Sequence, residues 1–425
     1  MRISIEADCH LNKALYKGVL DKKATTLPFR TVDFMRAHHY IVTQNIEKIK
    51  PDLMVIAGDT FDTYDPSNEV RAFNARQLKR LDDAGIKVII LVGNHDICKK
   101  HHALSPIKSF RFENIEVIEE PTLKVFRDKV LMLFPYSIKV ERNEISIKDQ
   151  FNEFVASCKK QIETEEKYQG KDVLFFGHFG VKGAVQKQYT DAVDEHLLTN
   201  ATTTKKKNRV NLSPNDISVD DLETINAKYI FLGDYHQHQI LPVKNSIAMY
   251  AGSIERTDMS EHNQSKGYVV YDDDNPIDPV MGKTKFMEYP KCRPMIEFRG
   301  TSSEIMAAIE ALPTKGVKGA IVKVSFVGST KELIEFSSNS EEIRKRIKVK
   351  VDPIHMYNQQ KVVDEDDEIL VSKLESEIIE KGECSAKEEV LLVIGEMIAE
   401  KQSDEKEREE LIKIAKSIWD ENMEG

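Results

Sequence analysis

Five short apolar runs, each followed at once by a cluster of Asp, His, Asn or Gly, constrain the fold of this chain more than any other feature. Each run is four or five residues long and rich in β-branched or aromatic side chains, which is typical of buried strands. The runs are Ile3–Ala7, Leu53–Ala57, Val88–Val92, Val173–Phe176 and Tyr229–Leu232. The segments Thr31–Lys50 and Asn68–Ala84 have the composition of helices. This alternation predicts an α/β layered domain.

The polar clusters after these runs are expected to meet. Sites in open α/β sheets form beyond the carboxyl ends of the strands, so five strand ends can bring together residues far apart in sequence. The clusters are Asp8-Cys9-His10, Gly58-Asp59-Thr60-Phe61-Asp62, Gly93-Asn94-His95-Asp96, Gly177-His178 and Gly233-Asp234-Tyr235-His236. One such cluster alone is more typical of a turn or a buried histidine. Five of them, each closing an apolar run, predict a site.

The residue types in these clusters favour two divalent ions. Carboxylate, amide oxygen and imidazole suit manganese, magnesium, iron or zinc, and thiolates are missing from the set. A carboxylate can bridge two ions about 3.5–4 Å apart, and Asp59 is our prediction for that bridge. An extended chain would turn Asp8 and His10 to the same side and Cys9 away from it. The glycines at 58, 93, 177 and 233 are expected to let the backbone turn sharply.

Length and charge set the wider organisation. A chain of 425 residues is too long for one ordinary core, so two or three domains are expected. The net charge of −10 is concentrated in residues 361–425, which hold 21 acidic and 9 basic side chains; the other 360 residues hold 50 and 52. Near-neutral charge in the body permits the basic patches that nucleic-acid binding needs.

The chain carries the marks of a cytoplasmic protein. It has no secretory signal and no apolar run long enough to span a membrane, so no membrane association is expected. Its five cysteines are scattered without a C-x-x-C pair, which argues against a zinc ribbon or a disulfide framework. We interpret most of them as small buried hydrophobic residues. The histidines outside the clusters, His38 and His39 among them, are interpreted as surface residues.

A smaller α/β unit and a helical tail follow the first domain. Met295–Phe298 and Ala320–Val327 are predicted strands, and Ser302 opens a predicted helix that ends near Leu312. After the acidic stretch Asp364–Glu368 the pattern becomes that of amphipathic helices, which either pack on their own domain or dock on another chain. We predict domains at 1–285, 286–358 and 359–425. The basic segment Thr199–Arg209 is predicted to be a surface loop.

The five clusters resemble those of the calcineurin-like metallophosphoesterases, whose pattern is D-x-H, G-D-x-x-D, G-N-H-[DE], G-H and G-H-x-H. Within that superfamily the chain resembles the SbcD-type DNA-repair nucleases, relatives of the meiotic recombination nuclease. The segment from Gly58 to Asp62 followed by Pro66, the run Tyr250–Arg256 and the triplet Lys266–Tyr268 carry this resemblance. It implies a two-sheet sandwich flanked by helices, a small α/β capping domain and a helical C-terminal tail.

The resemblance also implies the site residues. One ion would be held by Asp8, His10, Asp59 and His236, and the other by Asp59, Asn94, His178 and the residue at 234. The family usually has histidine where this chain has Asp234, and either Asp234 or the nearby His238 completes the second set. His95 would contact the scissile phosphate and serve the leaving oxygen, Asp96 would orient His95, and Asp62 would have an orienting or catalytic role.

The resemblance finally implies a function. It indicates a manganese-dependent exonuclease and endonuclease (magnesium being a second possible ion) that processes DNA ends in recombination and repair. The partners would be DNA, an SbcC-type coiled-coil ATPase bound through the C-terminal helices, and a second copy in a homodimer. A phosphoprotein or nucleotide phosphatase would share every ligand, and a non-catalytic DNA-end-binding scaffold would keep degenerate motifs. Both alternatives stay open at this point.

Overall fold

Two six-stranded sheets form the main body of the protein. The computed structural model describes residues 1–15, 27–184, 217–313 and 316–362. The first sheet has the order β14-β13-β1-β2-β3-β4 and the second the order β11-β12-β10-β7-β6-β5. In the first sheet the strands are β1 Arg2–Glu6, β2 Leu53–Ala57, β3 Lys87–Leu91, β4 Ile115–Ile118, β13 Gly267–Asp272 and β14 Thr284–Glu288. In the second they are β5 Thr122–Phe126, β6 Lys129–Phe134, β7 Asp172–His178, β10 Tyr229–Gly233, β11 Gln239–Leu241 and β12 Ile247–Tyr250.

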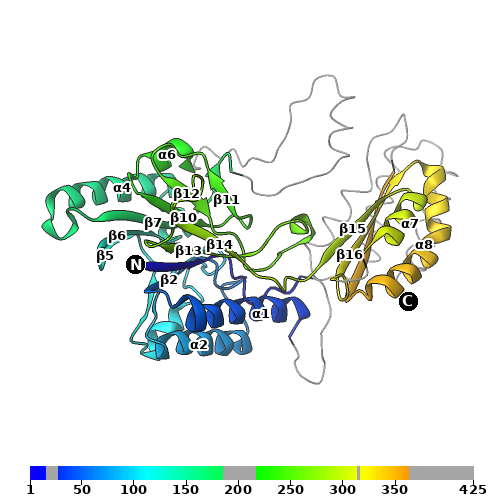
Figure 1. The fold of residues 1–425 in the computed structure, drawn as a ribbon, viewed down its shortest axis with the longest axis horizontal. Helices are drawn as coiled ribbons and strands as arrows, with labels where there is room; N and C mark the ends of the chain where they lie inside the picture. The colour runs from blue at the N-terminus through cyan, green and yellow to red at the C-terminus, as the bar shows by residue number, and fades with distance from the viewer. Residues whose placement is uncertain (16–26, 185–216, 314–315, 363–425) are drawn as a thin grey trace. The chain divides into compact units, whose positions relative to one another are not determined.

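The two sheets stack face to face, with helices on both outer faces (Figure 1). Alternation along the strands produces these layers, because neighbouring side chains on a strand point to opposite faces. In β2, Leu53 and Val55 join a buried cluster that contains β7 and β10 residues, whereas Met54 and Ile56 pack with the helices α1 (Phe29–Gln44) and α2 (Asn68–Asp83). Helices α4 (Ile147–Thr164) and α6 (Val219–Glu223) cover the second sheet. The predicted two-sheet sandwich is confirmed.

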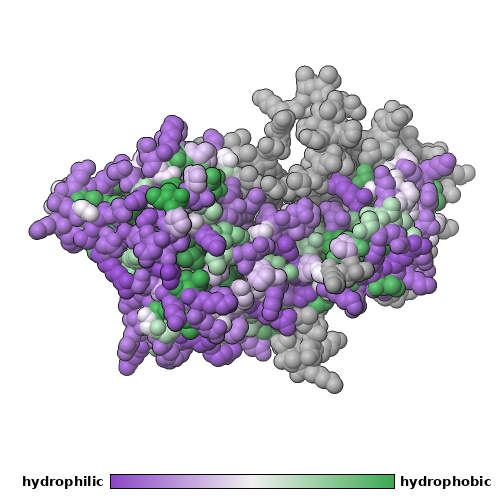
Figure 2. Space-filling model, in the orientation of Figure 1, coloured by the Kyte–Doolittle hydropathy of each residue, from purple (hydrophilic) through white to green (hydrophobic). Residues whose placement is uncertain are grey.

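The helices that cover the sheets are amphipathic. Helix α2 begins at a serine cap, where the Ser67 hydroxyl accepts a hydrogen bond from the Val70 amide. Helix α1 ends in a π-helical turn at Asn45–Ile49, after which Lys50 adopts a left-handed conformation. Hydrophilic residues cover most of the surface over α1, α2 and α4 (Figure 2).

The described helices include none that is long and apolar enough to cross a membrane.

The strands that precede the five clusters run parallel within each sheet. Strands β1, β2 and β3 are parallel neighbours in the first sheet, and β7 and β10 are parallel neighbours in the second. All five runs are therefore strands, as predicted, but they are divided between two sheets. Their carboxyl ends lie at one end of the sandwich, where the clusters follow them. The remaining short elements are η2 Ser105–Phe110, α3 Ile138–Glu141, η3 Glu166–Tyr168, β8 Val181–Lys182 paired with β9 Ile217–Ser218, and η4 Met259–Glu261.

A three-stranded sheet of order β15-β16-β17 follows, with strands Met295–Gly300, Ile321–Gly328 and His355–Val362. Its helices are α7 (Ser302–Ala311) and α8 (Thr330–Val351), and α8 packs on β16 through the rings of Phe326 and Phe336. The predicted strands and the Ser302 helix are confirmed, whereas α8 was not predicted.

The chain divides into two compact units. Met1–Glu297, Leu312–Lys323 and Ile347–Tyr357 form the first, and Phe298–Ala311, Val324–Arg346 and Asn358–Gly425 the second. The domain boundaries at 285 and 358 stay a prediction. The predicted tail helices and the basic segment Thr199–Arg209 lie outside the described residues.

Candidate metal centre

The loops after β1 and β2 run side by side and form one wall of the site. The amide of Asp8 donates to the Gly58 carbonyl oxygen (3.2 Å), and the amide of His10 donates to the Asp59 carbonyl oxygen (3.0 Å). Asp8 and His10 have φ values of 50° and 39°, so the loop is not extended and the reason given above for their common orientation is wrong. Asp59 and Asp234 also have positive φ, at 49° and 101°. Such conformations cost free energy and cluster at functional sites.

Four imidazoles share one arrangement, with Nδ1 close to an acceptor and Nε2 left for the centre. His178 Nδ1 donates to the Ala57 carbonyl oxygen at 2.8 Å, and His236 Nδ1 lies 2.8 Å from Glu261 Oε1. His10 Nδ1 lies 3.1 Å from Asp62 Oδ1. His95 Nδ1 donates to the Asp62 carbonyl oxygen at 3.0 Å. In His178, His236 and His95 the acceptor fixes the proton at Nδ1, so Nε2 keeps the lone pair that a metal ion needs. His10 Nδ1 lies near Asp62 but forms no hydrogen bond among the described residues.

These nitrogens converge with carboxylates at two adjacent points. At the first, Nε2 of His10 and Nε2 of His236 face each other at 3.0 Å, and Asp8 lies close to both. At the second, His178 Nε2 lies 2.9 Å from Asn94 Oδ1 and 3.3 Å from Asp59 Oδ1. This contact is a hydrogen bond when one ring carries its proton at Nε2, and a cation ligated by both nitrogens would take the place of that proton. The first point is therefore a candidate cation site.

Asp59 lies between the two points. Its Oδ1 faces His178, and its Oδ2 lies 3.8 Å from Nε2 of His10. Asp8 also belongs to both groups, together with His10 and His236 on one side and with Asp59 and His178 on the other. A carboxylate with one oxygen toward each ligand set has the geometry of a bridging ligand. This arrangement is consistent with the prediction that Asp59 bridges two ions, which stays a prediction.

The electrostatics of this region favour positive charge. Burial works to lower the pKa of His178, but the Asp59 carboxylate outweighs burial and raises that pKa to about 10. Burial works to raise the pKa of Asp59, yet His178 and His10 hold it well below its usual range. Burial, with Asp59 and Asp8 nearby, raises the pKa of Asp234 to about 6. Positive charge in this buried space therefore stabilises the ionised form of Asp59 and would do the same for Asp234.

Asp234 and His238 are placed differently. The Asp234 amide donates to Asp8 Oδ1 at 3.0 Å, so residue 234 adjoins the ligand loops. His238 Nδ1 donates to the Tyr250 carbonyl oxygen at 2.8 Å, and its ring stacks on Phe286 with centroids 4.3 Å apart. His238 is thus held in a packing position, and the geometry favours Asp234 as the fourth ligand of the second set. That assignment stays a prediction.

The contacts of Asp96 differ from those predicted, whereas Asp62 makes contacts of the orienting kind that was one of its two predicted roles. The buried Asp96 carboxylate accepts backbone N–H bonds from Thr60, Phe61 and Gly93 at 2.8–3.2 Å, so it ties the second cluster to the third. The expected orienting contact with the His95 ring is made instead by the Asp62 carbonyl oxygen. The Asp62 side chain lies by His10 and accepts a bond from Lys13 Nζ at 2.9 Å. Asp62 therefore positions both histidines.

Glu261 is a site residue that the sequence analysis missed. It is 3% exposed, and its Oε1 accepts from Nδ1 of His236 while its Oε2 pairs with Lys266 Nζ at 2.8 Å. Thr257 also lies beside His236 Nδ1, at 3.1 Å, and Lys266 Nζ donates to the His236 carbonyl oxygen at 2.9 Å. Glu261 lies in the short turn η4, outside any apolar run, so no local pattern indicated it.

The glycines of the clusters make room for the ligands. A Cβ on Gly93 would lie 2.2 Å from both the backbone N and Oδ1 of Asp59, and a Cβ on Gly58 would lie 2.0 Å from His178 Nδ1. Only Gly58 among the four predicted glycines has a positive φ, of 88°. The expectation of sharp turns is therefore wrong for Gly93, Gly177 and Gly233, which are needed for close approach.

Replacing Gly93 with alanine is expected to abolish metal binding, because the new methyl group displaces Asp59. Overpacking of this kind costs about 1–3 kcal/mol of stability. Gly170→Ala is the matched control: Gly170 has a φ of 71° with nothing within 4 Å of an added Cβ. That substitution costs about 1–2 kcal/mol through backbone strain alone. Urea unfolding and manganese titration calorimetry should show similar losses of stability, with metal binding lost only in the Gly93 variant. Normal binding in both would contradict this account.

The donor set fits a pair of divalent ions. It consists of carboxylate and amide oxygens with imidazole nitrogens, and no cysteine sulfur belongs to it. Oxygen and nitrogen donors of this kind suit manganese, magnesium, iron or zinc. His95 shares a group with His10 and Asp59 but is exposed, unlike those two. Its position at the open side of the site suits contact with a substrate.

Comparison with known proteins identifies the family of the chain. The family model for calcineurin-like phosphoesterases matches residues 1–238. The SbcD subunit of the SbcCD nuclease from Staphylococcus epidermidis is 28% identical over 288 residues, which is 65% of this chain and 67% of that protein. The corresponding Bacillus subtilis protein is 25% identical over 64% of this chain and 66% of its own length. The DNA double-strand break repair protein Mre11 of Sulfurisphaera tokodaii is 33% identical over 27% of each chain. The chain therefore belongs to the calcineurin-like phosphoesterase family and is a metal-dependent phosphoesterase similar to SbcD nuclease subunits.

Proposed function

We propose that this protein is a two-metal nuclease that hydrolyses phosphodiester bonds at DNA ends. The observation that carries the proposal is the place of Asp59 between two converging sets of ligands. The similarity to the SbcD subunits of SbcCD nucleases and to Mre11 supports DNA as the substrate. Manganese is the proposed ion, with magnesium as the alternative. Asp8, His10, Asp59 and His236 would hold one ion, and Asp59, Asn94, His178 and Asp234 the other.

The residues of the site account for the steps of hydrolysis. When bound, two adjacent divalent ions lower the pKa of water and offset charge on the phosphoryl oxygens. His95 is free at Nε2, because its Nδ1–H is held by the Asp62 carbonyl oxygen. In its imidazolium form His95 can therefore donate a proton from Nε2 to the departing oxygen. Asp96 keeps the backbone of the second and third clusters in register during this step.

We further propose that the chain acts as the nuclease component of an SbcC/SbcD-type recombination and repair complex. The two SbcD relatives support this assignment by their similarity over about two thirds of both chains. The partner would be a coiled-coil ATPase bound by the C-terminal helices predicted after residue 359, and the nuclease would form a homodimer. The partner-binding segment lies outside the described residues, so its role rests on the sequence pattern.

The test is digestion of end-labelled linear and hairpin DNA by the full-length protein with manganese, with and without an SbcC-type ATPase. Hydrolysis of p-nitrophenyl phosphate is measured in parallel. Metal-dependent shortening of DNA supports the proposal. Hydrolysis of p-nitrophenyl phosphate without DNA cleavage would instead identify a phosphatase. DNA binding without either reaction would identify an end-binding scaffold, and both outcomes would overturn the nuclease assignment.

Replacing Glu261 with glutamine is expected to lower the affinity for one metal ion by about 10–100-fold, the usual effect of losing a carboxylate that orients a ligating histidine. Glutamine removes the charge that fixes Nδ1–H of His236 while keeping the side-chain shape. Glu255→Gln is the matched control, because Glu255 is equally buried and bonds to the amides of Arg256 and Arg293 rather than to a histidine. Manganese titration should show weaker binding only for Glu261→Gln. An equal loss in both variants would indicate general destabilisation.

A further inference from the structure

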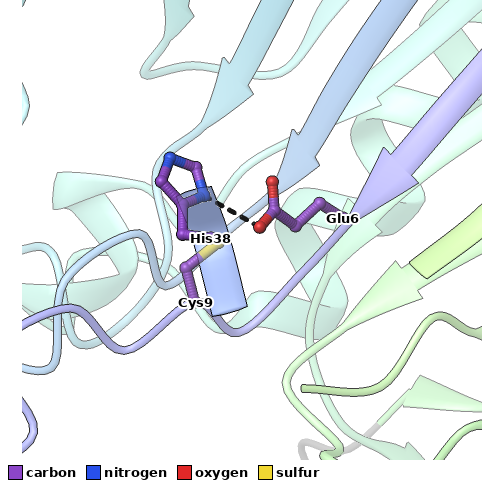
Figure 3. Close-up of side chains that lie close together, drawn as sticks. All are labelled: Glu6, Cys9 and His38. Atoms are coloured by element: carbon purple, nitrogen blue, oxygen red, sulfur yellow. Dashed lines mark hydrogen bonds and ion pairs between the residues drawn. The ribbon is translucent and has the colours of Figure 1, made fainter. Parts of the chain in front are cut away.

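A second group of potential metal ligands comes from β1, the loop after it and α1. Glu6 is the last residue of β1, Cys9 lies in the loop after it, and His38 comes from α1. All three are fully buried. Nδ1 of His38 lies 2.8 Å from Oε1 of Glu6, and the Cys9 thiol points toward this pair (Figure 3). One donor atom from each residue lies within 4.8 Å of the others.

One of these residues, His38, contradicts the sequence interpretation, and Cys9 is buried as predicted. His38 is buried against the ring of Phe73 and is not a surface residue. Cys9 does point away from the ligands of the centre, but it points into a polar group and not only into apolar surroundings. The cause is the alternation of β1: Ile3 and Ile5 face the layer between the sheets, so Glu6 faces α1. A charged side chain is thereby buried between the sheet and the helices, in a layer that also holds polar residues such as Asn74.

The polar atoms of this group are only partly satisfied. Glu6 Oε2 and His38 Nε2 are buried without a hydrogen-bond partner among the described residues. Burying a carboxylate is costly unless its charge is compensated and its oxygens are bonded. A divalent cation held by a thiolate and a carboxylate leaves no net charge. One carboxylate oxygen of Glu6, the sulfur of Cys9 and one nitrogen of His38 supply three donor atoms of the types that zinc binds, and a water molecule would complete four-coordination.

We propose that Glu6, Cys9 and His38 form a structural zinc site, separate from the two-ion centre. The thiolate distinguishes the two sites, because sulfur and imidazole select zinc whereas the oxygen-rich centre suits manganese or magnesium. The zinc site would hold the loop that carries Asp8 and His10 in its left-handed conformation. The zinc site would therefore position Asp8 and His10, two predicted ligands of the two-ion centre. This inference does not depend on the nature of the substrate.

Cobalt substitution tests the proposal in the full-length protein. A cobalt–thiolate bond gives a charge-transfer absorption band in the near ultraviolet, which the oxygen and nitrogen donors of the two-ion centre cannot give. Wild-type protein reconstituted with cobalt should show this band, and Cys9→Ser should lose it. Cys98→Ser is the matched control, because the Cys98 sulfur lies 3.6 Å from His101 Nδ1 and is the other described thiol beside an imidazole. That variant should keep the band.

Metal analysis provides a second readout that does not depend on the Cys9 variant folding. Wild-type protein dialysed against manganese should retain one zinc ion per chain, and a variant that keeps Cys9 while all other cysteines are serine should retain it too. Absence of both zinc and the thiolate band from the wild-type protein would overturn the proposal and leave a hydrogen-bonded group only. The nuclease proposal would be untouched by that result, because DNA cleavage is assayed separately.

Discussion

His95→Asn is expected to lower the turnover of DNA cleavage by about 10²–10⁴-fold, the usual contribution of a general acid, while two manganese ions still bind. The reason is the position of the ring. His95 is exposed at the open side of the site, whereas His10, His178 and His236 have Nε2 turned toward the carboxylates. Asparagine keeps polarity at this position but cannot donate a proton to a leaving oxygen. Rapid-quench cleavage of labelled DNA and manganese titration measure the two effects separately.

The control for His95 is His39→Asn. His39 lies on α1, where its Nδ1 contacts Gln77 and Arg80 of α2, and it belongs to none of the groups of potential ligands among the described residues. Cleavage by that variant should match the wild type. A loss of manganese binding in His95→Asn, in step with the loss of turnover, would show that His95 is a ligand. A ligand role for His95 is the main alternative to test, because His95 lies in one group of potential ligands with His10 and Asp59.

Asp59→Asn is expected to have the largest effect of any single substitution, because it removes charge from both ligand sets at once. Two-metal stabilisation of the transition state is worth several kcal/mol, and each 1.4 kcal/mol is about tenfold in rate, so cleavage should fall by about 10³-fold or more. Asparagine retains an Oδ1 acceptor for the His95 amide, which lies 2.9 Å from Asp59 Oδ1, so the local backbone is preserved. Manganese binding should fall from two ions to one weakly held ion or none.

Asn94→Ala gives the comparison for Asp59. Asn94 Oδ1 contacts Nε2 of His178 and is predicted to belong to the second ligand set alone, so its loss should weaken one ion and spare the other. Equilibrium dialysis with manganese distinguishes these patterns, and circular dichroism verifies the fold of each variant. Should Asp59→Asn and Asn94→Ala lose the same single ion, Asp59 does not bridge, and Asp8 becomes the candidate for that role.

The location of the site could be predicted because it follows from a local pattern. Each candidate ligand lies at or soon after the end of a buried strand, and a short apolar run that ends in Asp, His or Asn is visible in sequence without knowledge of strand pairing. The division of the five strands between two sheets was not visible in the same way. Pairing joins residues far apart, as with Ile3 beside Tyr271 in β1 and β13, and no local feature encodes it.

The residues that hold the candidate ligands in place were the hardest to predict. Glu261 reaches His236 from 25 positions away, and its own turn carries no periodic pattern. The resemblance implied that Asp96 orients His95, but its carboxylate turns back to the amides of Thr60 and Phe61. His38, interpreted as a surface residue, is fully buried. Each error arises where a tertiary contact outweighs the local signal.

The division of the ligands between the two sheets makes the layer between them part of the site. Asp8, Asp59 and Asn94 follow strands of one sheet, whereas His178 and His236 follow strands of the other. The stacked rings of Phe176 and Phe231, just before the latter pair, are buried in that layer. The thickness of an apolar layer thus determines how far apart the two halves of the ligand shell stand. We therefore expect substitutions that change the packing of apolar side chains between the sheets to change the affinity for metal ions.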